Sequence, residues 1–351
     1  MAPFRIELRR KNPSGLLVAA LLLFNGLGLA LMLTAGRYPV SLYVRNALFS
    51  EVVDDQQVPS EAALNTLLER RIRQDPAWFR ARSLFTSTEL VRLDALVTAS
   101  RNRNCRVPSD SALTVLSPAD CLARALAKDV SPFMMGGKCG LDGSLRSRIG
   151  LVRQGVGCCS DYNEAFLLRA QATGLQAREL HNMGHTTAEY FDPLRRRWHW
   201  LDTSNRVQVA DGEGQLLSAY QLRGRFPLRA LRFIDLPPIS RDPKVSGDQF
   251  GGFLSSANSI LFWTKGQNIL QIEAFEAPLR LLGLPKELAQ ASSLGLGVRP
   301  GWLVLASPEA AFRFRLSSWL LKAGLLGFVL ADLALLAAAL GFRLTRNRVF
   351  R

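Results

Sequence analysis

Histidine is scarce in this sequence of 351 residues, which holds only His181, His185 and His199. Any reaction that needs an imidazole must therefore use one of these three side chains. Metal binding is disfavoured, because the chain also lacks the Cys-x-x-Cys pair that is typical of zinc sites. We expect neither a bound metal ion nor a cofactor.

Lysine is scarce as well, with seven among the 44 basic residues, although the formal net charge is +15. An arginine bias of this kind often reflects the base composition of a genome. The basic residues are scattered and do not alternate with aromatic side chains, so we predict no nucleic-acid binding. The positive surface suits anionic lipid headgroups or acidic polymers instead. Repeats and long low-complexity tracts are absent, and the 48% of hydrophobic residues predicts a folded chain.

Charged residues are almost absent from two long segments. The first, Gly15–Ala35, is uncharged over 21 residues and contains one strongly polar side chain, Asn25. At about 1.5 Å per residue, a helix of that length spans the ~30 Å hydrocarbon core of a bilayer. Basic residues outnumber acidic ones before it, which predicts a cytoplasmic N-terminus. Leu33–Gly36 matches a signal-peptide cleavage site only loosely, so we expect an uncleaved anchor.

The second segment, Ala323–Phe342, is interrupted only by Asp332 and is followed by several arginines. It is apolar on every face, whereas a buried amphipathic helix would show a polar stripe. The arginines place the C-terminus in the cytoplasm, so the region between the anchors lies outside it. In a bacterium with two membranes, these features predict an inner-membrane protein with a periplasmic main domain.

Asn25 and Asp332 lie near the middle of the two segments, and antiparallel packing would bring them to a similar depth. A carboxyl group at the bilayer midplane usually finds a partner, and the glycines and alanines around Asp332 allow close helix packing. We hypothesise an Asn25–Asp332 hydrogen bond. The alternatives are that Asp332 is protonated, or that it faces another subunit, in which case the second anchor would dock a membrane protein partner.

The region between the anchors begins with helices and continues with strands. Apolar spacing and capping residues predict helices over 60–74, 87–100, 118–129 and 161–173. Strands are predicted over 177–180, 186–191 and 197–201, with further segments near 207–210 and 228–234. This order predicts an α+β fold with helices packed on an antiparallel sheet. No element is assigned to Phe250–Trp263, and Ala274–Leu284 either lies along the membrane surface or fills a groove.

The predicted organisation follows from these segments. It comprises a cytoplasmic N-terminus (1–14), a transmembrane helix (15–36), a mainly helical extracytoplasmic region (37–140), an α+β core (141–240), an extension of undefined structure (241–315), a second transmembrane helix (316–342) and a cytoplasmic C-terminus (343–351).

A thiol, an imidazole and a carboxylate occur in an order that suits nucleophilic catalysis. Cys159 follows a glycine-rich turn and opens a predicted helix, whose dipole favours the thiolate. His185 opens one predicted strand, and Asp202 ends the next, where it can accept the Nδ1–H of the imidazole. Strand alternation puts His199 on the opposite face, as a structural residue, and leaves the role of His181 open.

Four motifs in order resemble the transglutaminase-like core of the papain-like cysteine enzymes. They are Gly157-Cys158-Cys159-Ser160-Asp161-Tyr162, Thr173-Gly174-Leu175-Gln176-Ala177-Arg178, Gly184-His185 to Glu189, and Trp200-Leu201-Asp202-Thr203. The resemblance covers about residues 150 to 205. It implies that Cys159 is the nucleophile, His185 the general base and acid, and Asp202 the residue that orients it, and it suggests Gln154 as an oxyanion donor. The chain has Thr186-Thr187 where the family often has Ala-Trp, and it lacks a proline after Asp202, so one wall of the cleft differs.

Five cysteines leave one unpaired if disulfides form, as they do outside the cytoplasm. Cys105–Cys121 and Cys139–Cys158 are one possible pairing, and others remain open. A strained bridge between Cys158 and Cys159 would silence the nucleophile and act as a redox switch.

Two functions compete on this basis. The first is a membrane-anchored thiol acyl-transfer enzyme that acts on peptides or proteins, as a peptidase, amidase or transglutaminase. The second is a non-catalytic transglutaminase-like accessory subunit of a cell-envelope complex that exports polysaccharide or protein.

Overall fold

A computed structural model describes residues 23, 25, 48, 50–71, 81–102, 116–130, 145–182, 185–223, 231–236, 260–266, 268–284, 286–299 and 302–349. The chain divides into two compact units. One combines Met1–Leu48 with Phe314–Arg351, and the other is Phe49–Arg313. Each unit is described by itself.

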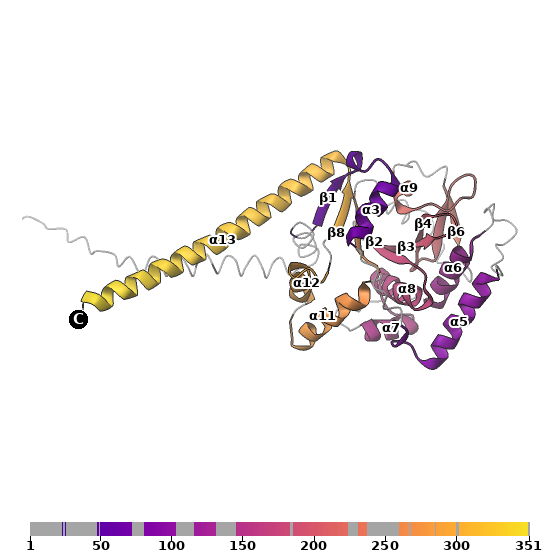
Figure 1. Ribbon diagram of the computed structural model, residues 1–351, viewed down its shortest axis with the longest axis horizontal. Coiled ribbons are helices and arrows are strands. Elements are labelled where there is room, and N and C mark those ends of the chain that lie inside the picture. Colours follow the sequence, from indigo (N-terminus) through magenta and orange to yellow (C-terminus); the bar gives the residue numbers. More distant parts are fainter. Residues whose placement is uncertain are drawn as a thin grey trace, which may run out of the picture. The chain divides into compact units, whose positions relative to one another are not determined.

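An eight-stranded sheet forms the centre of the larger unit, in the order β1-β8-β7-β2-β3-β4-β5-β6 (Figure 1). All neighbouring strands are antiparallel except β1 and β8, which pair in parallel, so the sheet is mixed rather than antiparallel as expected. The strands are β1 (Ser50–Asp54), β2 (Ala177–His181), β3 (Thr186–Asp192), β4 (Arg197–Asp202), β5 (Val207–Ala210), β6 (Arg232–Asp235), β7 (Ile260–Lys265) and β8 (Trp302–Ala306).

Helices cover both faces of the sheet. On one face, Ala188, Tyr190 and Leu201 pack against helices α5 (Ser87–Arg101), α6 (Pro118–Val130), α7 (Leu145–Arg153) and α8 (Cys159–Thr173). On the other, Leu180, Trp200 and Trp263 pack against α3 (Glu61–Arg71) and α9 (Ala219–Leu222). Neighbouring residues of one strand point to opposite faces, which explains why Trp200 and Leu201 belong to different cores. The α+β fold class is therefore present.

Local sequence signals account for the ends of several helices. Ser60 and Thr86 cap α3 and α5 by accepting amide hydrogens in the first turn, at 3.2 and 3.3 Å. Ser117 and Asp120 form a reciprocal capping box at the start of α6. Gly174, with φ of +77°, ends α8 in the left-handed conformation that glycine adopts without strain.

Three strands come from segments to which sequence analysis assigns no strand. β1 lies within the region expected to be mainly helical, and β7 and β8 lie within the unassigned 241–315. The apolar segment 274–284 falls largely in α11 (Ile269–Leu281), which precedes α12 (Lys286–Gly295). Ile269 belongs to the core cluster, whereas Leu281 and Leu282 are 88% and 80% exposed. The extension therefore completes the sheet and its core.

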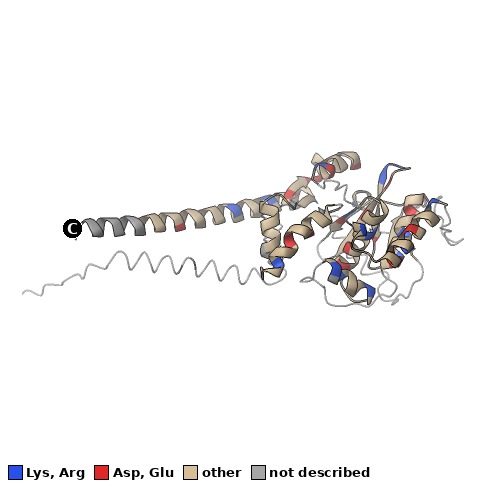
Figure 2. Ribbon diagram, turned by 60° about the horizontal axis from the view of Figure 1, so that its bottom comes forward, with Lys and Arg blue, Asp and Glu red and all other residues tan. Residues whose placement is uncertain are grey.

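The smaller unit contains most of a long apolar helix, α13 (Pro308–Val349). Among the described residues, only this helix is long and apolar enough to cross a membrane, within Pro308–Ala338. Figure 2 shows few charged residues along it. The first expected span, Gly15–Ala35, lies outside the described residues except for Leu23 and Asn25, so a candidate span is found for the second expected segment alone and the first stays a prediction.

Asn25 and Asp332, the polar residues of the two expected spans, form the hydrogen bond that the sequence suggested. Asn25 Nδ2 donates a hydrogen bond to Asp332 Oδ1 at 3.3 Å. In hydrocarbon, where water does not compete, a bond of this kind favours association of two helices.

We predict that Asn25 and Asp332 are energetically coupled. Asn25→Leu and Asp332→Leu should each destabilise the full chain in detergent, and a double-mutant cycle should give a coupling of about 0.5–1.5 kcal/mol. Asp332→Asn, which still accepts a hydrogen bond, is the matched control and should retain most of the stability. Additive effects of the two leucine substitutions would show that the pair contributes nothing.

Candidate active site

Cys159 is the first residue of α8. The turn that precedes it contains two glycines with positive φ. Gly155 has φ of +73° and Gly157 φ of +137°. A Cβ on Gly157 would lie 3.2 Å from Cβ of Asp161, whose Oδ2 accepts the Cys158 N–H at 3.0 Å. Only glycine fits this turn without strain. The two glycines therefore allow the turn that leads into α8, with the thiol of Cys159 at the first position of the helix.

His185 occupies the connection between β2 and β3. Its N–H donates to Asn182 Oδ1 at 3.2 Å, and its carbonyl accepts the Asn182 N–H at 3.1 Å. Its Nε2 lies 2.6 Å from Asp202 Oδ2, whereas the sequence predicts that Nδ1 faces the carboxylate. Nε2 is the ring nitrogen farther from the His185 backbone, so it reaches Asp202 at the end of β4. The other ring nitrogen, Nδ1, is then the one that can hydrogen-bond the sulfur of Cys159.

Asp202 ends β4 and is completely buried. Its Oδ1 accepts hydrogen bonds from both the amide and the hydroxyl of Ser204 and from the amide of Asn205, at 2.7–3.0 Å. The Asn205 side chain donates to Oδ2 at 2.7 Å. Burial alone would raise the pKa of Asp202, but the charge of His185 and these donors outweigh it and lower that pKa. The carboxylate therefore stays ionised and holds the imidazole in place.

The imidazole of His185 and the thiol of Cys159 each shift the pKa of the other. Burial alone would lower the pKa of His185, but Asp202 and the hydrogen bond with Cys159 raise it to about 10. Burial alone would raise the pKa of Cys159, but the hydrogen bond and charge of His185, with hydrogen bonds from Thr186, lower it. This arrangement favours a thiolate–imidazolium pair, the reactive form of a nucleophilic cysteine.

Oxyanion donors are available at the start of α8. The amides of Cys159 and Ser160 open the helix and have no acceptor within it, and they lie at its positive end. Gln154 is exposed in the turn after α7, and its side chain makes no hydrogen bond to any described residue. Its role as an oxyanion donor stays a prediction.

Of the three cysteines that the structure describes, two are disulfide-bonded and Cys159 is free. Cys121 and Cys158 each form a disulfide, while Cys105 and Cys139 lie outside the described residues, so the proposed pairing stays a prediction. Because Cys159 is free, the bridge between Cys158 and Cys159 is absent. The Cys159 thiol therefore remains available next to a crosslinked neighbour.

His199 lies in a second, separate cluster. Its Nδ1 lies 2.8 Å from Asp120 Oδ1, which also accepts the Tyr190 hydroxyl at 2.7 Å. Burial alone would raise the pKa of Asp120, but the hydrogen bond and charge of His199 lower it well below its usual range. His199 takes no part in the Cys159 site.

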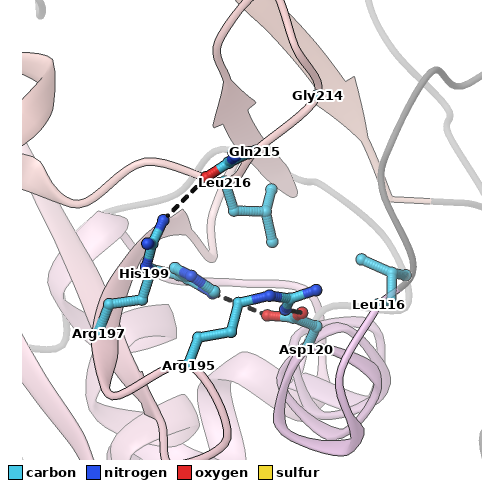
Figure 3. A pocket seen from close by; sticks show the side chains of 8 residues that line it. All are labelled: Leu116, Asp120, Arg195, Arg197, His199, Gly214, Gln215 and Leu216. Carbon is cyan, nitrogen blue, oxygen red and sulfur yellow. Dashed lines mark hydrogen bonds and ion pairs between the residues drawn. The ribbon is translucent and has the colours of Figure 1, made fainter.

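A pocket of about 250 Å³ borders this second cluster (Figure 3). Ligand atoms of Asp120, Asp192 and His199 lie within 4.8 Å of one another, as in a metal site. However, Arg195 Nη1 already bridges the two carboxylates, at 2.8 Å from Asp120 and 3.0 Å from Asp192. A cation would have to displace this guanidinium, so the donor set does not fit a metal ion. The pocket is lined by Leu116, Asp120, Arg195, Arg197, His199, Gly214, Gln215 and Leu216.

Several residues of the site are not evident from motifs. Asn205 and Ser204 follow Asp202, and an aspartate that accepts amides two and three residues ahead is a common turn, so this pairing has a local signal. The contacts of Ser160, His181 and Thr186 join different elements, and no local sequence pattern predicts them.

No protein-family model matches the chain, and comparison with curated proteins gives no significant match.

Gly157→Ala should destabilise the protein by about 1–3 kcal/mol, because an alanine at this φ is strained and its Cβ crowds Asp161. Thermal unfolding measures the loss. Gly150→Ala is the matched control, since its added Cβ meets no atom within 4 Å and alanine favours the helix. Equal stability of the two variants would contradict the strained turn.

The alkylation rate of Cys159 by iodoacetamide should rise with pH through an inflection below the ordinary thiol pKa of about 8.5. Because the pKa is depressed in the folded protein, the thiolate is present above that inflection and lost below it. In His185→Ala the inflection should move upward by one pH unit or more. Burial raises the pKa of Cys159, and without the imidazole this effect is less strongly opposed. Mass spectrometry of the labelled peptide gives the rates, and an unchanged inflection would contradict the ion pair.

Proposed function

We propose that this protein is a membrane-anchored thiol acyl-transfer enzyme that acts on peptide or protein amides outside the cytoplasm. One observation carries the proposal. A free cysteine at a helix start is hydrogen-bonded to an imidazole whose far nitrogen lies 2.6 Å from a fully buried carboxylate. The pKa shifts of the three groups favour the thiolate, the imidazolium and the carboxylate, the forms that nucleophilic catalysis needs.

The first half of the reaction forms a thioester. The Cys159 thiolate attacks the amide carbonyl carbon, and the carbonyl electron pair moves to oxygen. The amides of Cys159 and Ser160 are placed to stabilise that oxyanion. When the intermediate collapses, the carbon–nitrogen bond breaks and His185 Nδ1 gives its proton to the leaving amine.

The second half releases the acyl group. His185, now neutral, accepts a proton from water or from an amine as that molecule attacks the thioester. Collapse breaks the carbon–sulfur bond and restores the thiolate and imidazolium. Water makes the protein a peptidase or amidase, and an amine makes it a transglutaminase. Asp202 keeps the imidazole oriented through both halves.

Location and family rest on separate support. The candidate span in α13 and the disulfides of Cys121 and Cys158 favour a protein anchored in a membrane with its larger unit in an oxidising compartment, such as the periplasm. Membership of the transglutaminase-like superfamily is supported by the four motifs and by the way Cys159 at the start of α8, His185 just before β3 and Asp202 at the end of β4 come together.

Trapping the acyl-enzyme tests this function. The purified full-length protein in detergent is incubated with an activated acyl ester, and the Cys159 peptide is weighed by mass spectrometry. The wild type should acquire one acyl group that hydroxylamine removes, whereas Cys159→Ser should acquire no hydroxylamine-labile thioester. His185→Ala should slow acylation by about 100-fold or more.

A second experiment distinguishes hydrolysis from amide formation, and a third distinguishes catalysis from a non-catalytic accessory role. Adding a primary amine to the acylated enzyme distinguishes amide formation from hydrolysis. If Cys159→Ala retains full biological function in cells, the catalytic proposal is wrong and a non-catalytic accessory role is supported.

A further inference from the structure

His181 and Thr186 face each other at the end of the β2–β3 pair, beside the start of α8. They are the last pair in the register between β2 and β3, and His181 Nδ1 lies 2.9 Å from Thr186 Oγ1. Directly opposite residues in an antiparallel pair have side chains on the same face, so this contact follows from the register. Neither residue has a role in the reaction steps above.

Thr186 also contacts the helix that carries the nucleophile. Its hydroxyl lies 2.9 Å from Ser160 Oγ, next to Cys159, and hydrogen bonds from its amide and its hydroxyl lower the pKa of the Cys159 thiol. The Thr186 hydroxyl thus has three neighbours: a hydroxyl, an imidazole nitrogen and the thiolate. A hydroxyl has one hydrogen to donate and two lone pairs to accept with, so its single proton goes to one neighbour at a time.

The other side of the His181 ring is fixed by a carboxylate. Nε2 lies 2.9 Å from Glu179 Oε1 and 3.2 Å from Thr264 Oγ1, and Thr264 itself donates to Glu179 at 2.8 Å. Burial alone would raise the pKa of Glu179, but Lys265 and His181 hold it well below its usual range. Glu179 is therefore an acceptor, and Nε2 carries a hydrogen. The remaining variable is whether Nδ1 carries one as well.

We propose that Thr186 is a positioning residue whose hydroxyl donates to the Cys159 thiolate, and that His181 sets the direction of this hydroxyl. With Nδ1 protonated, His181 donates to Thr186 Oγ1, and the threonine proton points at the sulfur. With Nδ1 bare, the threonine proton turns to the imidazole and the sulfur loses that donor. The inference rests on the proposed use of Cys159 as the nucleophile.

Charged groups lie on several elements around this contact. Glu179, on the same strand, contacts His181 Nε2, and the ammonium of Lys265 on β7 is bonded to both Glu179 and Glu164. Cys159 on α8 is hydrogen-bonded to Thr186 and to His185, and His185 is paired with Asp202. The carboxylate of Glu179 is thus the charged group in direct contact with the His181 ring.

The pH profile of Cys159 alkylation tests the inference without any substrate. Thr186→Val should move the inflection upward by about one pH unit, because the thiolate loses a charge-assisted donor. Thr186→Ser restores the hydroxyl and should restore the wild-type inflection. Thr187→Val is the matched control: it removes the neighbouring hydroxyl, which accepts from Trp200 and makes no contact with the sulfur, and it should leave the inflection in place.

A double-mutant cycle identifies the role of His181. His181→Ala should shift the inflection in the wild-type background and shift it much less in the Thr186→Val background. Equal shifts in both backgrounds would overturn the claim that His181 acts through Thr186. An unshifted Thr186→Val profile would overturn the whole inference, whereas a wild-type inflection at or above about 8.5 would instead overturn the proposed function. Circular dichroism confirms that each variant is folded, and the serine variant keeps the test decisive if the valine variant is not.

Discussion

The burial of α8 on every side is the constraint on which the rest of the larger unit depends. This helix carries polar side chains into the interior, and each needs a partner there. Arg169 pairs with Asp129 of α6, and Asn163 donates to a backbone carbonyl of β3. Glu164 binds both Arg148 of α7 and Lys265 of β7. These contacts fix two helices and two strands around the element whose first residue is the thiol.

Electrostatics at the site follows from the same low-polarity interior. A buried carboxylate, an imidazolium and a thiolate are each costly alone, yet in a row they alternate in sign and stabilise one another. Asp202 and Glu179 play parallel parts, since each is a buried carboxylate that holds one nitrogen of a histidine. Cys159 is hydrogen-bonded to His185 and to Thr186, and Thr186 in turn contacts His181. The thiol is therefore connected to both imidazole–carboxylate pairs.

Local signals predicted much of this structure, and long-range contacts account for most of what they missed. Gly174 ends α8 as expected, and the turn after Asp192 joins β3 and β4. Cys159, His185 and Asp202 could be singled out from the sequence because each follows a turn or ends a strand. By contrast, β1 pairs only with β8, and neither segment carries a pattern that reveals the other. The His181–Thr186–Ser160 contacts likewise depend on register and helix placement, which one sequence does not encode locally.

The parallel pair of β1 and β8 has a consequence for the order of folding. Ser50 pairs with Trp302, so the first strand of the sheet has no partner until almost the whole larger unit has been synthesised. Contacts that are distant in sequence form slowly, because a long chain must be brought to closure before they contribute. Strands β2 to β6 lie close together in the sequence and can assemble earlier. The sheet then grows from β7 by the addition of β8, and β8 pairs with β1. By this argument, the pairing between the two ends of the domain is expected to form last.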